Sequence, residues 1–134
     1  MKKTEKVGYV DGFVLIVPIK NRGTYIEMAK GAGKMWIKCG ALGYFESVGD
    51  DFNAVGAGEM KGMAFPDLTK IKSGETVWFS YITYRSRAHR DQVNKKVNVK
   101  IAKIDPKVRD MNLHFDLGRM AFGGFKVEVD LLGE

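Results

Sequence analysis

The hydrophobic and polar positions along the chain predict four strands and two helices. The predicted strands combine β-branched and aromatic residues in short runs bounded by turn residues. They span residues 9–17, 42–48, 76–84 and 120–131. Residues 22–39 instead repeat apolar side chains at helical spacing, and Gly40 suits the end of that helix.

A second helix is expected to begin after Ser86, whose hydroxyl can cap its first turn. His89 and Val93 then share one face, four residues apart. Residues 97–101 also alternate at period two, so the sequence leaves open where this helix ends.

The order of these elements predicts an α+β fold, a ferredoxin-like βαββαβ unit with a four-stranded antiparallel sheet. Residues 1–134 are expected to form a single domain, with a flexible segment at 1–8 and a long loop at 50–75. Both crossovers place their helices on one face of the sheet. The other face would expose an apolar patch, and the simplest partner for it is a second copy, which predicts a homodimer through the sheet face.

Positive charge is concentrated in one part of the chain. The net charge is +6, and residues 85–109 carry nine basic against two acidic side chains. Such a segment can attract RNA or an acidic partner, although a solvated helix face is the simpler explanation. Nucleic acid is a partner that the sequence allows but does not favour, because a sheet face buried in a dimer cannot stack bases.

The cysteine content and hydropathy pattern suggest a cytoplasmic protein without a membrane span. Cys39 is the single cysteine, which excludes an internal disulfide and fits a reducing compartment. The longest apolar stretch, residues 13–19, is much shorter than the roughly 20 residues of a spanning helix, and no targeting signal is recognisable.

His89 is the first candidate for chemistry, because a histidine at a helix start tends to stay neutral and can act as a base. Arg87 and Arg90 flank it and suit a carboxylate or phosphate. The alternative is a structural histidine, hydrogen-bonded at the sheet edge.

Asp11 is the second candidate, because it interrupts an otherwise apolar strand. A buried carboxylate must be paired or its pKa must rise, and a raised pKa allows proton transfer. Arg119 is the expected partner, and a purely structural ion pair is the alternative.

Aromatic side chains could line a ligand pocket between sheet and helices. Trp36, Trp78 and Tyr84 are the candidates, although core or interface packing is the commoner role. No motif names a cofactor, and two distant histidines with one cysteine do not make a metal site.

Several ordered motifs resemble the uncharacterised YbaA-like family, a domain of unknown function, over nearly the whole chain. They include Tyr9-Val-Asp-Gly-Phe-Val, Ala32-Gly-Lys-Met-Trp36, Gly49-Asp-Asp51, Ser86-Arg-Ala-His-Arg-Asp91 and Phe115-Asp116. The resemblance implies membership of the dimeric α/β-barrel superfamily, in which two such sheets pack face to face. In monooxygenases of that superfamily a polar residue, a tryptophan and a histidine occupy places comparable to those of Asp11, Trp78 and His89.

The sequence therefore predicts a small-molecule-binding, dimeric α/β-barrel protein. Monooxygenase-like oxidation or proton transfer are the reactions considered, and whether the protein is an enzyme is left open, as is its cofactor. The alternative is a non-enzymatic module that binds RNA or an acidic partner through the basic segment 85–109.

Overall fold

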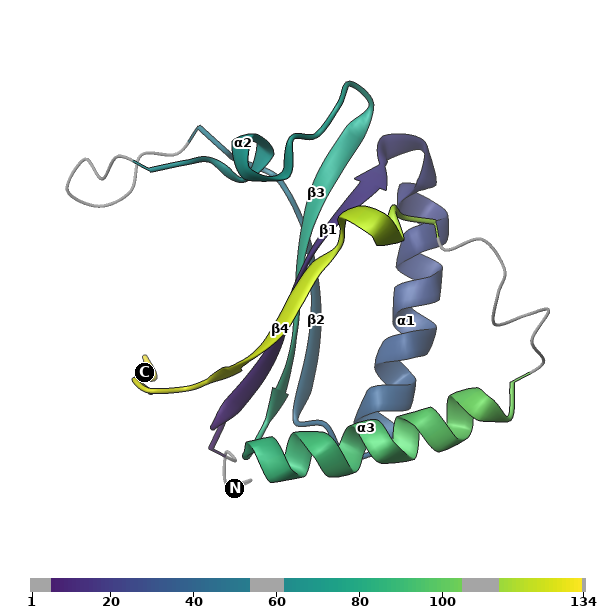
Figure 1. Ribbon diagram of the computed structural model, residues 1–134, viewed down its shortest axis with the longest axis vertical. Coiled ribbons are helices and arrows are strands. Elements are labelled where there is room, and N and C mark those ends of the chain that lie inside the picture. The colour runs from purple at the N-terminus through teal and green to yellow at the C-terminus, as the bar shows by residue number, and fades with distance from the viewer. Residues whose placement is uncertain (1–5, 54–61, 105–113, 134) are drawn as a thin grey trace.

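The computed structural model describes residues 6–53, 62–104 and 114–133 (Figure 1). The strands are β1 (Tyr9–Pro18), β2 (Gly43–Val48), β3 (Glu75–Tyr84) and β4 (Ala121–Lys126). The α-helices are α1 (Arg22–Lys38), α2 (Phe65–Thr69) and α3 (Arg87–Ala102), and two single 3-10 turns, η1 (Ile19–Asn21) and η2 (Leu117–Arg119), precede α1 and β4.

The four strands form one antiparallel sheet in the order β2-β3-β1-β4. This order places the two longest and most apolar strands, β1 and β3, in the middle. The predicted α+β class with a four-stranded antiparallel sheet is confirmed, and the arrangement is compatible with a ferredoxin-like fold.

Helices α1 and α3 lie on the same side of the sheet, with α3 crossing near one end of α1 (Figure 1). The Ser86 hydroxyl accepts a hydrogen bond from the backbone N–H of His89 at 3.1 Å, as the capping prediction required. Val93 and Val97, on the face of α3 that packs on the sheet, are both 1% exposed. The helix continues to Ala102, which answers the question that the sequence left open for residues 97–101.

Two groups of buried side chains join the helices to the sheet. One surrounds Tyr84 and includes Val93 and Val97 of α3, and the other surrounds Trp78 and includes Tyr25 of α1. The edge of the Tyr25 ring meets the Trp78 ring with centroids 4.7 Å apart. The first group lies beside the candidate site.

The last strand is shorter than predicted. β4 ends at Lys126, and Val129, Leu131 and Leu132 beyond it are 76%, 88% and 79% exposed. The predicted strand over residues 120–131 with one buried face is therefore wrong. Lys126 pairs with Tyr9, where β1 begins, so β4 has no strand to pair with beyond this point.

The long connection after β2 contains the short helix α2, with a proline in its first turn. Figure 1 places α2 on the side of the sheet opposite α1, and Phe65 contacts Phe79 of β3 with ring centroids 6.2 Å apart. The expected flexibility of residues 1–8 falls largely outside the described residues, although the Gly8 N–H donates to the Tyr84 carbonyl at 2.9 Å. Within the described ranges, no helix has the length and apolar character needed to cross a membrane.

Candidate functional site

A buried ion pair joins the sheet to α3. Asp11 shares the helix-facing side of β1 with Tyr9 and Phe13, because alternate residues of a strand point the same way. The Arg90 Nη1 donates to Asp11 Oδ1 at 2.8 Å, and the side chains of the pair are only 19% and 10% exposed. The guanidinium carbon also lies 5.0 Å from the centre of the Tyr9 ring, within range of a cation–π contact.

The protonation of Asp11 is set by two opposing effects. Burial raises the pKa of the Asp11 carboxyl above its ordinary value, and the charge of Arg90 reverses only part of that rise. The Tyr84 hydroxyl is completely buried beside this carboxylate, and burial and Asp11 together raise the pKa of Tyr84. Among the described residues, that hydroxyl has no hydrogen-bond partner of ordinary geometry.

The ion pair forms part of the wall of a pocket of about 300 Å³, here called the Asp11 pocket. The pocket lies where β1 and β4 meet the facing side of α3 and the last turns of α1. Its walls include Asp11, Phe13, Trp36, Arg90, Asn94 and Phe122. The rings of Phe13 and Phe122 stack with centroids 6.2 Å apart, and the Trp36 Nε1 donates to Asn94 Oδ1 at 3.3 Å. An apolar wall with a few polar groups is typical of small-molecule sites.

His89 is held by the backbone on both sides of its ring. Its Nδ1 accepts from the Arg85 N–H at 2.9 Å, so the ring hydrogen resides on Nε2, which donates to the Gly40 carbonyl at 2.9 Å. The side chain is 7% exposed and its ring meets the edge of Tyr84. This geometry favours the structural alternative, since Nε2 ties α3 to the turn after α1 and Nδ1 ties it to the segment between β3 and α3.

The other predicted site residues are distributed over several places. Trp36 lines the Asp11 pocket, and Arg87 is exposed on the first turn of α3. Trp78 pairs with Leu15 in the sheet, four residue pairs or roughly 13 Å along the strands from Asp11. Asp11, Trp78 and His89 are therefore not gathered around one pocket, as the comparison with monooxygenases implied.

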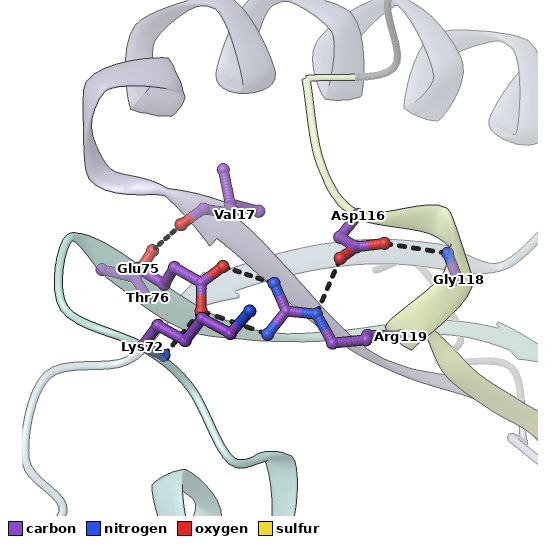
Figure 2. A network of polar contacts seen from close by, with 7 residues as sticks. All are labelled: Val17, Lys72, Glu75, Thr76, Asp116, Gly118 and Arg119. Carbon is purple, nitrogen blue, oxygen red and sulfur yellow. Dashed lines mark hydrogen bonds and ion pairs between the residues drawn. The ribbon is translucent and has the colours of Figure 1, made fainter.

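Arg119 does not pair with Asp11, which corrects the sequence prediction. It lies in η2, before β4 begins, and Figure 2 shows its guanidinium between Glu75 and Asp116. Arg119 Nη1 donates to Glu75 Oε1 at 3.1 Å, Nη2 donates to Oε2, and Nε donates to Asp116 Oδ2 at 2.7 Å. The bonds from Arg119 to Glu75, and then the bond from the Lys72 N–H, lower the pKa of Glu75 to about 2. Arg119 thus fixes the segment before β4 to the start of β3.

Glu46 is a half-buried polar centre that the sequence reasoning missed. This carboxylate of β2 accepts hydroxyl hydrogen bonds from Tyr25 at 2.7 Å, Tyr44 at 3.1 Å and Ser80 at 2.6 Å. Burial, and then the bond to Glu46, raise the pKa of Tyr25, so its hydroxyl stays a donor. The signal was present, since an acidic residue in the middle of an apolar strand is as unusual as Asp11 in β1. No cluster of metal-ligating side chains occurs in residues 6–53, 62–104 or 114–133.

Comparison with known proteins places this fold and site in a class without an assigned activity. The family described as "Protein of unknown function (DUF1428)" matches residues 8–117, and this chain belongs to that family. The chain is 34% identical over 124 residues to the "Uncharacterized protein YbaA" of Escherichia coli K12, covering 91% of this chain and 97% of that protein. The protein of the same name from Shigella flexneri matches with the same identity and coverage.

Proposed function

We propose that the protein binds a small organic molecule in the Asp11 pocket and exchanges a proton with it through Asp11. The observation that carries the proposal is a carboxylate in the pocket wall whose pKa is raised by burial while Arg90 holds it in place. Phe13 and Phe122 suit an apolar ring or chain, and Arg90 and Asn94 suit a hydrogen-bonding oxygen. A ketone or phenol fits this combination, and proton transfer fits Asp11 better than oxidation does.

Binding is tested by thermal unfolding in the presence of ketones, phenols and small carboxylic acids. A ligand at about 100 times its Kd stabilises the folded state by roughly 2.7 kcal/mol, which raises the melting temperature measurably. We expect Asp11→Asn and Arg90→Met to lose this stabilisation, while Lys96→Glu, on the exposed side of α3, retains it. If no compound class stabilises the protein, or if Asp11→Asn responds as the unmodified chain does, the proposal fails.

Proton transfer is tested separately on a ketone that binds. In deuterated water, NMR follows replacement of the hydrogens next to the carbonyl by deuterium. Asp11→Glu should retain some exchange, whereas Asp11→Asn should stop it. Exchange that continues in Asp11→Asn would show that another group carries the proton.

The finer architecture belongs to the same proposal: a homodimer of single ferredoxin-like domains, packed sheet to sheet as a dimeric α/β barrel in the cytoplasm. The support is the sheet face opposite α1, here called the open sheet face, where Phe45, Phe79 and Phe125 are 46%, 45% and 62% exposed. Phe79, Tyr81 and Phe125 line a hollow of about 580 Å³, and Phe45 stacks on Tyr81. A hollow of this kind, lined by uncharged side chains, suits an identical surface.

Light scattering on the native chain should give twice the chain mass at micromolar concentration. Phe125→Asp, on the open sheet face, should shift the protein to monomer, because a carboxylate buried between two sheets has no counter-charge there. Val99→Asp is the matched control, since this apolar side chain is 52% exposed on α3, on the other side of the sheet, and does not line the hollow. A monomer for the native chain, or equal effects of the two variants, would contradict the proposed dimer.

Binding to RNA or an acidic protein is the second candidate, favoured by the exposed lysines of α3. Lys95, Lys96 and Lys100 of α3 are exposed, as is Lys103 directly after the helix. Retention on RNA that falls steeply with salt, and that is lost in Lys95→Glu with Lys96→Glu, would favour this function over the pocket.

A further inference from the structure

A second hollow, larger than the Asp11 pocket, lies away from it. It has a volume of about 940 Å³ and runs between α1 and the edge strand β2, with Trp78 of β3 at its inner wall. We call it the α1–β2 groove. It shares no lining residue with the Asp11 pocket, so the inference below stands independently of the proposed function.

The floor of the groove is apolar because of the spacing of residues along α1. Ile26, Ala29, Gly33 and Ile37 repeat every three or four positions and therefore form one stripe of the helix facing β2. This stripe is roughly 16 Å long at 1.5 Å per residue. Val48 continues the apolar surface on β2. Ile37 is 47% exposed, so the apolar surface is open to a ligand.

The rim of the groove is positively charged. Arg22, Lys30, Lys34 and Lys38 line it from the same helix, and Lys30, Lys34 and Lys38 follow one another at intervals of four residues. Lys30 is paired with Glu27 at 3.6 Å. Glu46 is the one acidic residue among the lining side chains, and three hydroxyl groups already donate to it. The charge around the groove therefore favours an anionic ligand.

Trp78, at the inner wall, carries a buried hydrogen-bond donor that lacks an acceptor in the described part of the chain. Trp78 is 3% exposed, and within the described residues its indole N–H has no hydrogen-bond partner. A buried donor without an acceptor costs free energy. A ligand that lies along the groove would contact this side chain, so its indole N–H signal reports on occupation of the groove.

We propose that the α1–β2 groove binds an amphipathic organic acid, with its apolar chain along the stripe of α1 and its carboxylate at Lys34 and Lys38. The volume is within the range of small-molecule sites, and the apolar floor with a cationic rim matches a ligand that is apolar along its length and anionic at one end. A medium-chain fatty acid has this chemistry.

Decanoate is the probe, measured by calorimetry and by the NMR signals of the two indole N–H groups. Decanoate should bind in a one-to-one complex and shift the Trp78 indole signal, while the Trp36 signal, which reports on the Asp11 pocket, stays in place. Decyltrimethylammonium has the same chain and the opposite charge, and it should bind about tenfold more weakly or not at all.

Charge reversal locates the carboxylate. Lys34→Glu with Lys38→Glu should weaken decanoate binding about tenfold. The matched control reverses Lys95 and Lys96 on α3, which are equally exposed and do not line the groove, and should leave binding unchanged. All four side chains are exposed, so the variants retain the fold. Equal binding of the two probes, equal effects of the two double variants, or a shift of Trp36 instead of Trp78 would overturn the inference.

Discussion

Replacement of His89 by alanine separates a structural from a catalytic role for this residue. The change removes a donor to the Gly40 carbonyl and an acceptor for the Arg85 N–H, both at 2.9 Å. Each hydrogen bond contributes about 0.5–1.5 kcal/mol, and loss of the buried ring that packs on Tyr84 adds about 1 kcal/mol. We therefore expect the free energy of unfolding to fall by roughly 2–4 kcal/mol.

Urea denaturation followed by tryptophan fluorescence measures this loss. Arg87→Ala is the matched control, because it lies on the same turn but is exposed, and its effect should stay within about 0.5 kcal/mol. In His89→Gln the amide N–H replaces Nε2–H as the donor to Gly40, but no acceptor stands at the position of Nδ1, so its stability should fall between those of the native chain and His89→Ala. A loss below about 1 kcal/mol in His89→Ala would refute the structural role.

Two further predictions concern Gly124 and Arg90. An added Cβ at Gly124 would collide with the Tyr9 hydroxyl, so Gly124→Ala should lower the free energy of unfolding by about 1–3 kcal/mol in the same urea assay. Gly23→Ala is the control: no atom lies within 4 Å of the added Cβ, and the change should raise the free energy of unfolding by up to about 1 kcal/mol. In Arg90→Met the pKa of Asp11 should rise further, because its counter-charge is removed. The folded state then binds more protons than the unfolded state, whose pKa is near 3.8. As the pH rises above about 4, the free energy of unfolding should therefore fall more steeply than in the native chain. Adding Asp11→Asn should remove this slope, and a slope that persists would assign it to another group.

The sequence predicted the four strands and two main helices because their apolar spacing is regular and their ends carry specific residues. The start of α3 is an example, since a serine directly before a run of helical spacing is a recognisable cap, and Ser86 does cap this helix. The extent of β4 could not be predicted in this way. Periodicity reports which residues suit a strand, but pairing requires a neighbour, and β1 offers none beyond Tyr9.

The candidate site was predictable in part for the same kind of reason. Asp11 could be identified because a carboxylate in an apolar strand is unusual, but its partner depended on distances that no spacing rule gives. Both Arg90 and Arg119 were available in the sequence, and the path of α3 across the sheet brings Arg90 to Asp11. Glu75 and Asp116 hold Arg119 elsewhere.

The segment that follows β4 links the error in the predicted strand to the proposed dimer. Its apolar residues still alternate with charged ones, as in a strand with one covered face, yet Val129 and Leu131 face solvent. Figure 1 shows this segment leaving the sheet on the same side as α2, the side of the open sheet face. If a second copy covers the open sheet face and also one side of this segment, the alternation of apolar and charged residues after Lys126 is explained. In the proposed dimer, the alternating pattern that lacks a partner within one chain would gain one from the second copy.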